Sequence, residues 1–137
     1  MVWRLEPDQA LIVEMDNHDG FWIFGMGGVF GNSMDFLYRS VSYTPARTKV
    51  DADGVVRLVL CNEDPGVHNW LDTQGFSDGN LTYRNLMSTA RTTLRTRVLP
   101  RRDLVTALPP DTAMVTPAER RQKMYDRYRS VKLRYGL

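Results

Sequence analysis

The residues best suited to chemistry lie in one short run, residues 64–72, which reads DPGVHNWLD. His68 stands between two carboxylates, Asp64 and Asp72, and a neighbouring carboxylate raises the pKa of an imidazole. Such a histidine can act as a general acid or base near neutral pH, so His68 and Asp72 are the candidate catalytic residues. The structural alternative is that Asp64 caps a turn, while Asn69 and Asp72 hydrogen-bond to loop amides.

Trp70 adds two further interpretations to the same run. Its side chain either anchors the loop in the core or forms the wall of a pocket. A pocket wall would indicate a small-molecule ligand, apolar or sugar-like. The candidate ligand-binding residues are Trp70, Asn69, Tyr83, Arg84 and Trp22, with Phe76 as a further aromatic neighbour.

The elements that must hold this run are predicted to be strands. Residues 55–61 read VVRLVLC and form the clearest strand, directly before the run. The run itself is predicted to be a loop, because Pro65 donates no amide and Gly66 weakens strand pairing. Alternating or β-branched patterns predict further strands at residues 10–15, 21–26, 41–44, 79–86 and 93–99.

Turn formers predict how some of these strands connect. The polar residues 16–20 predict a hairpin between the first two strands, and Asp53-Gly54 predicts a second tight turn. Ser33 is a candidate cap for a short helical turn that would pack Phe36 and Leu37 inward. Another helical turn is predicted within residues 103–108, between the prolines of a connector.

A helix is predicted over residues 116–135. Thr116 and Glu119 form a capping box, with Pro117 at the first helical position, and Gly136 stands where the helix would end. An apolar stripe at helical spacing, Met124, Tyr128, Val131 and Tyr135, predicts packing against the strands or a neighbouring subunit.

The net charge of +2 is unevenly distributed. Seven of the cations lie in the predicted helix: Arg120, Arg121, Lys123, Arg127, Arg129, Lys132 and Arg134. A basic end on a slightly acidic body suits self-association or partner docking at least as well as a phosphate backbone, so we do not expect nucleic acid as the partner.

Composition and motifs restrict the number of domains, the expected location and the kinds of site. The 137 residues suit a single domain, with the strands in residues 1–110 and the helix in residues 116–135. No apolar run approaches the length of a membrane helix, no signal peptide is recognisable and Cys61 has no partner cysteine, so we expect a cytoplasmic protein. His18, His68 and Cys61 lack zinc-site spacing, and no phosphate loop or nucleophile elbow occurs, so we expect neither a metal nor a cofactor.

Several segments resemble a bacterial family called domain of unknown function 1214. The central one, residues 64–73 with Gly75, contains the Asp-Pro-Gly and Asn-Trp-Leu-Asp-Thr elements that members share. Residues 5–14, 33–39 and 116–121, together with Tyr83-Arg84 and Arg97-Val98, are also similar to the family. The resemblance implies a jelly-roll-like β-sandwich, which in larger relatives follows a companion domain, domain of unknown function 1254. This chain departs at Met26-Gly27-Gly28, where many relatives carry polar or aromatic residues, and at His68, where relatives often carry proline or alanine.

The sequence therefore predicts a mainly β protein, a jelly-roll-like β-sandwich with a C-terminal amphipathic helix. One predicted function is a non-catalytic binding or accessory module, such as the small subunit of a larger assembly, which would form a homo-oligomer or bind a companion subunit. The alternative is a small enzyme that acts on a carbohydrate-like or apolar metabolite, with His68 and Asp72 as acid and base and Tyr83 and Arg84 nearby.

Overall fold

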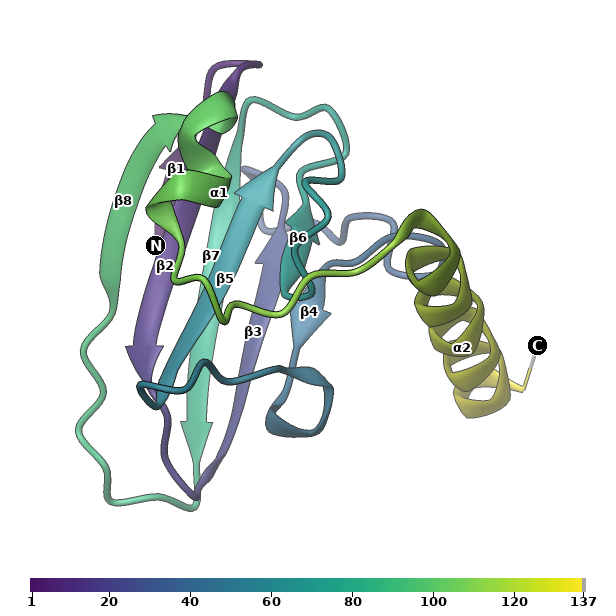
Figure 1. Cartoon of the computed structure of the whole chain (residues 1–137). Coiled ribbons are helices and arrows are strands. Elements are labelled where there is room, and N and C mark those ends of the chain that lie inside the picture. Colours follow the sequence, from purple (N-terminus) through teal and green to yellow (C-terminus); the bar gives the residue numbers. More distant parts are fainter. Residues whose placement is uncertain (137) are drawn as a thin grey trace.

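The computed structural model describes residues 1–136 as two four-stranded sheets and a long C-terminal helix (Figure 1). The strands are β1 (Val2–Arg4), β2 (Gln9–Asp16), β3 (Phe21–Gly27), β4 (Ser42–Tyr43), β5 (Val55–Cys61), β6 (Trp70–Asp72), β7 (Asp78–Leu86) and β8 (Arg95–Pro100). The helical elements are η1 (Pro45–Arg47), η2 (Arg101–Asp103), α1 (Leu104–Ala107) and α2 (Pro117–Tyr135).

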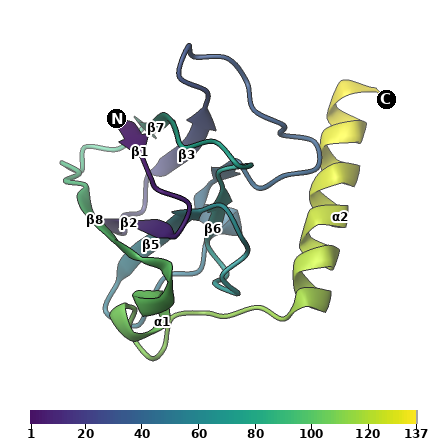
Figure 2. The ribbon, with the colours of Figure 1, turned by 90° about the horizontal axis from the view of Figure 1, so that it is seen from above.

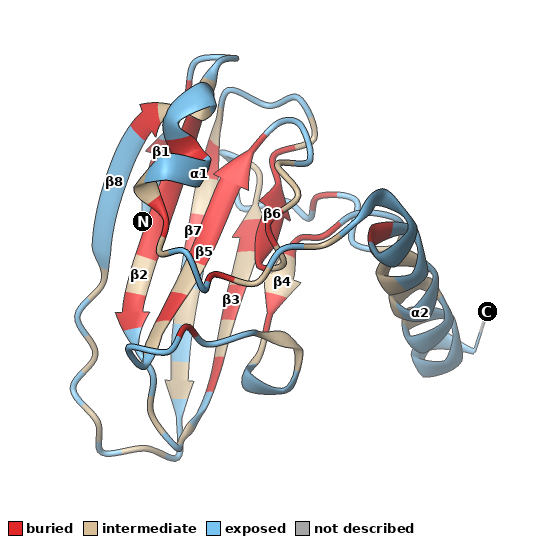
Figure 3. Ribbon diagram, in the orientation of Figure 1, coloured by how far each residue is buried: buried red, intermediate tan, exposed pale blue. Residues whose placement is uncertain are grey.

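The two sheets share one apolar core. One sheet has the order β1-β7-β3-β4 and the other has the order β6-β5-β2-β8. Trp22, Phe24 and Leu81 of the first sheet pack with Met15 and Leu58 of the second in a single buried cluster. Figure 3 shows that buried residues are concentrated on β2, β3, β5 and β6.

The second sheet is also covered on its outer face, which explains the apolar runs of β2 and β5. Ile12 and Val59 pack there with Leu104 and Leu108 of the segment around α1, in a second buried cluster that includes Trp70. A strand that is buried on both faces needs apolar residues at successive positions rather than alternating ones.

Most predicted strands are confirmed, but the expected hairpin at residues 16–20 is wrong. β2 pairs with β5 and β8, whereas β3 pairs with β7 and β4, so this turn connects different sheets. The turn at Asp53-Gly54 is confirmed: Gly54 has a φ of 80° and donates its amide to Asp51 O at 2.9 Å. The local polarity of a turn does not determine whether the flanking strands pair with each other.

The helical turn expected at Ser33 is absent from the structure, in which residues 32–39 contain no helix. Asp35 takes the capping role instead, because its Oδ1 accepts the amides of Leu37 and Tyr38 at 3.0 Å each. Phe36 stays 40% exposed rather than packing inward. A short polar side chain that bonds the next amides offers the backbone an alternative to a helix.

The C-terminal helix has the predicted ends, and its predicted stripe contacts the body in part, with Tyr128 stacked on Tyr38 and Tyr135 beside Phe36. The capping box of Thr116 and Glu119 is present, and Gly136 caps the helix with a φ of 66°. Met124, Tyr128 and Val131 of the predicted stripe are only half-buried and Tyr135 is exposed, while the one buried residue of α2 is Arg120. Viewed from above in Figure 2, α2 runs along one side of the sheets, beside the connection from β3 to β4.

Candidate functional site

The run at residues 64–72 is partly a strand, which corrects the prediction of a loop throughout. Residues 62–69 form a turn-rich loop, and β6 then pairs in parallel with β5, Val59 opposite Trp70. The loop begins as predicted, because Asp64 Oδ1 accepts the amide of Gly66 at 2.9 Å and Gly66 has a φ of 74°. A three-residue parallel strand shows no recognisable alternation, so sequence periodicity does not reveal it.

The connector before α2 holds the middle of this loop. His68 donates its amide to Ala113 O, and Val115 donates its amide to Gly66 O, both at 2.8 Å. The connector thereby runs antiparallel to the loop and places the first turn of α2 directly beside it.

Trp70 is an anchor, as one of its two interpretations predicted. The side chain is 7% exposed and packs in the second core cluster. Its indole Nε1 donates to Cys61 O at 3.0 Å, which satisfies the polar atom of a buried ring.

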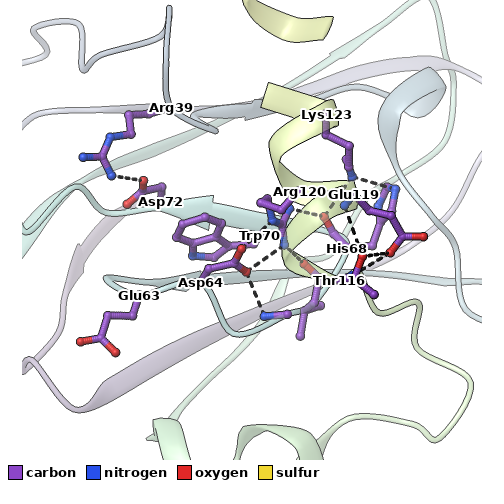
Figure 4. Close-up of polar contacts among 12 residues, drawn as sticks. Arg39, Glu63, Asp64, His68, Trp70, Asp72, Thr116, Glu119, Arg120 and Lys123 are labelled. Atoms are coloured by element: carbon purple, nitrogen blue, oxygen red, sulfur yellow. Dashed lines mark hydrogen bonds and ion pairs between the residues drawn. The ribbon is translucent and has the colours of Figure 1, made fainter. Parts of the chain in front are cut away.

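Arg120 clamps α2 to this loop, and sequence reasoning missed it. Its Nε and one terminal nitrogen hold the two oxygens of Asp64 at 2.9 and 3.1 Å, while the other terminal nitrogen donates to His68 O at 3.3 Å (Figure 4). It also donates to the carbonyl oxygen of Val67. The guanidinium lies 5.1 Å from the centre of the Trp70 ring, within cation–π distance. No local pattern marks an ion pair between residues 56 positions apart.

His68 does not lie between the two carboxylates. Asp64 pairs with Arg120, whereas Asp72 is buried, pairs with Arg39 at 2.9 Å and accepts the amide of Gln74. The predicted acid–base pair of His68 and Asp72 is therefore not assembled. Figure 4 shows the Asp72–Arg39 pair on the other side of Trp70 from the imidazole.

Both ring nitrogens of His68 have partners. Nδ1 lies 2.9 Å from Asn69 Oδ1, and Nε2 lies 2.8 Å from Lys123 Nζ. A lysine ammonium only donates, so Nε2 accepts and Nδ1 carries the proton that is donated to Asn69. Burial, together with the charge of Lys123, lowers the pKa of His68. His68 is thus a neutral, fixed imidazole, more exposed than Asn69 or Asp72 as predicted.

Asn69 has a structural role. Its side-chain amide donates to Lys49 O and Arg57 O, and its Oδ1 also accepts the amide of Lys49 at 3.0 Å. These bonds tie the loop to the neighbouring segments rather than to its own amides. The residue is 4% exposed and has little surface left for a ligand.

The other candidate ligand-binding residues are not gathered around Trp70. Trp22 is fully buried in the shared core, and Tyr83 packs against that core with its hydroxyl 3.0 Å from His18 Nε2. Arg84 lies on the far face of the first sheet, where it lines a separate hollow over Gly25. Phe76 is 54% exposed.

A groove of about 600 Å³ lies between α2 and the body, and we call it the α2 groove. The side contributed by α2 consists of Lys123, Asp126, Arg127, Ser130, Val131, Arg134 and Tyr135. The side contributed by the body consists of Ile23, Phe36, Ser42, Thr44, Ala46, Arg47, Thr48, Lys49 and His68. Five of these residues are cations and one is a carboxylate, so the groove is positively charged.

Two of the groove cations are held partly out of water, and no carboxylate of residues 1–136 lies within salt-bridge distance of either. Desolvation, followed by repulsion from Arg120 and Arg47, lowers the pKa of Lys123 to about 8. Desolvation, followed by repulsion from Arg47, lowers the pKa of Arg127 to about 10. The Arg127 guanidinium donates only to neutral oxygens, Phe36 O at 2.9 Å and Ser42 Oγ at 3.4 Å.

The described part of the chain contains neither a metal-binding cluster nor a membrane-spanning helix. Among residues 1–136, no group of three or more His, Cys, Asp or Glu side chains is placed to hold a metal ion. None of the helices in that range combines the length and the apolar character that crossing a membrane requires.

Comparison with known proteins gives one relevant similarity. No protein-family model matches the chain, and no curated protein matches it. The fold is similar to the crystal structure of an uncharacterized protein from Burkholderia cenocepacia, with a TM-score of 0.70 and 28% sequence identity. The match covers 78% of this chain but only 29% of that protein, so this chain corresponds to under a third of its length.

Proposed function

We propose that this protein is a non-catalytic binding or accessory module whose ligand occupies the α2 groove. The observation that carries the proposal is the groove itself, which is about 600 Å³ and lies between α2 and the body. Its volume is within the range of roughly 300–1,000 Å³ that is typical of small-molecule sites.

The arrangement of the candidate catalytic residues supports binding rather than catalysis. His68 uses both ring nitrogens in structural contacts, and the Asp72 carboxylate is engaged by Arg39 and by the amide of Gln74. A general base needs a lone pair that the substrate proton can reach, whereas both ring nitrogens of His68 are engaged and the Asp72 carboxylate is buried.

The similarity to a longer protein supports the accessory part of the proposal. In that protein the matched region is 29% of the chain, so the fold occurs there together with much additional polypeptide. We propose that the chain belongs to the family of domain of unknown function 1214 and that its two sheets form a jelly-roll-like sandwich. On this view the chain acts together with a companion subunit.

One observation favours the enzymatic alternative. Lys123 has its pKa lowered to about 8 and lies against His68 at the wall of the groove. A lysine with a lowered pKa can serve as a base or a nucleophile, and perturbed groups are frequent in active sites. In this alternative Lys123 takes the role that the sequence assigned to His68 and Asp72.

The experiment is a retention assay with a defined mixture of small metabolites. The purified protein is incubated with the mixture, unbound compounds are removed by gel filtration, and the retained compounds are identified by mass spectrometry. We expect a compound that is retained and recovered chemically unchanged. Conversion of a retained compound would favour the enzyme, and the absence of any retained compound would contradict both functions.

A matched pair of variants locates the site in the same assay. Arg127→Ala removes a half-buried cation from the groove, whereas Arg121→Ala removes an exposed cation from the same helix. Retention that is lost only in Arg127→Ala supports the α2 groove. Equal retention by both variants would place the ligand elsewhere.

A further inference from the structure

We propose that the ligand of the α2 groove is an amphiphilic organic anion, a small molecule with one acidic head group and an apolar body. This inference rests on the proposed function and names the chemical class of its ligand. It follows from the charges, the hydrogen-bond partners and the apolar residues that line the groove.

The charges of the groove are unbalanced. Its cations are Arg47, Lys49, Lys123, Arg127 and Arg134. Within residues 1–136, no carboxylate oxygen lies within 4.0 Å of a charged nitrogen of any of these five side chains. The one carboxylate that lines the groove, Asp126, accepts instead from Gln122 at 2.9 Å. Cations that line a concave wall focus a positive potential, which attracts an anion.

Two largely buried arginines elsewhere in the molecule are paired with carboxylates, unlike the half-buried cations of the groove. Arg57 on β5 is paired with three carboxylates, those of Glu14, Asp51 and Asp53, at 2.7–2.8 Å. Arg120, one turn before Lys123, is paired with Asp64. The half-buried cations of the groove therefore differ from the buried cations elsewhere, and they lack the counter-charge that an acidic head group would provide.

The position of the hydrogen-bond donors favours an oxygen-rich head group. Lys123 Nζ and the Arg127 guanidinium are bonded to neutral acceptors and keep donor capacity. Thr44 and Ser130 line the same groove and carry further hydroxyl groups, whereas the Thr48 hydroxyl already donates to Thr44 O at 2.8 Å. Charge-assisted hydrogen bonds from ammonium and guanidinium groups are the strong contacts to a carboxylate or a phosphate.

Apolar side chains indicate that the ligand is more than an inorganic ion. Ile23, Phe36, Ala46, Val131 and Tyr135 line the groove together with the cations. A bare anion would neutralise the charge and leave these side chains wet, whereas an apolar body would bury them. A neutral sugar would bury polar surface but leave the cations without a partner.

Isothermal titration calorimetry with small probes tests both halves of the proposal. The probes are 4-phenylbutyrate, phenyl phosphate, 4-phenylbutyramide, acetate and inorganic phosphate. We expect both aromatic acids to bind, with the neutral amide at least roughly ten-fold weaker, since a hydrogen bond to a charged group is worth about that factor. Acetate and inorganic phosphate should bind more weakly than the aromatic acids, and the two acidic arms reveal whether carboxylate or phosphate is the preferred head group.

Matched variants connect the binding to the groove. Lys123→Met and Arg127→Met should each weaken binding of the preferred acid by roughly ten-fold, while Arg121→Met on the same helix should change it less than about two-fold. Thermal melting of each variant checks that it is folded. Charge reversal in Lys123→Glu should abolish binding of the acids, and higher salt should weaken it in the native protein.

Three results would overturn the proposal: an amide that binds as tightly as the acid, equal effects of Lys123→Met and Arg121→Met, or no binding of either aromatic acid at millimolar concentration. A neutral metabolite in the retention assay would likewise overturn the ligand class, while the binding function itself would stand. No retained metabolite of any charge would overturn the function as well.

Discussion

The guanidinium of Arg120 lies over the ring of Trp70 at 5.1 Å, so the one buried residue of α2 covers the anchor of the loop. The same guanidinium holds Asp64 with two hydrogen bonds and binds the carbonyl of His68. This contact joins α2 to the body at its first turn. The position of the groove beyond it depends on that joint.

We therefore predict that Arg120→Met destabilises the protein. The expected loss in the free energy of unfolding is about 3 kcal/mol, at the lower end for a broken buried ion pair because Asp64 remains 33% exposed. Chemical denaturation measures it, with Arg121→Met as the control that removes an exposed arginine from the same turn. Equal stability of the two variants would show that the clamp contributes nothing.

We predict that Trp70→Ala lowers the free energy of unfolding at least as much as Arg120→Met does, for a different reason. The substitution empties a position in the second core cluster and leaves Cys61 O without its donor. We expect a loss of about 3–5 kcal/mol, as for other large-to-small changes in a core. Normal stability with lost ligand binding would instead identify Trp70 as a pocket wall.

Lys123 should make stability rise with pH above 8. Its pKa is about 8 in the folded protein, against an ordinary value of 10.5. Between these values the unfolded chain binds more protons than the folded one, so unfolding becomes less favourable as pH increases. Below pH 8 both states are protonated and the cost of the buried ammonium is fully present.

The test compares the native protein with Lys123→Met from pH 7 to pH 9.5. The stability difference between the two should shift in favour of the native protein as pH rises through 8. Burial raises the pKa of Cys61 to about 12, so this thiol makes stability fall as pH rises. Both proteins contain Cys61, so its contribution cancels in the comparison. Parallel stability curves for the two proteins would contradict the environment described for Lys123.

The start of α2 and the strand β5 show which features can be predicted from the sequence. Thr116 and Glu119 predicted the start of α2, and residues 55–61 predicted β5, because capping boxes and apolar strands are local signals. The prediction that Trp70 is buried and anchors the loop is also confirmed. The start of α2 and β5 depend on neighbours within a few positions of the chain, whereas Trp70 was predictable from its large apolar side chain.

The features that sequence reasoning missed are set by contacts between distant segments. Arg120 and Asp64 are 56 positions apart, and the α2 groove unites segments near Arg47 with a helix that begins at Pro117. The seven helix cations were recognised, but only folding brings Lys123 and Arg127 opposite Arg47. The expected pairing of His68 with Asp72 is wrong because Asp72 is buried beyond Trp70 and pairs there with the exposed Arg39.

Self-association remains a prediction. The outer side of α2 exposes Leu133 at 80% and Tyr125 at 55%, and exposed apolar residues on an added helix are a common route to symmetric oligomers. Light scattering should give a mass above the monomer mass of 15.8 kDa, and Leu133→Glu should lower it. A monomer mass at every concentration would contradict this prediction.

The most direct test of the account is an NMR titration of the native protein with 4-phenylbutyrate, followed through backbone amide shifts. We predict that the shifts concentrate at residues that line the α2 groove, such as Thr44, Thr48, Lys123 and Arg127. Amides around Asp72 should not move, and neither should those of Asn32 and Asn80, which line the second hollow beyond Ile23. Shifts confined to that hollow, or no shifts at all, would contradict the claim that the α2 groove is the ligand site.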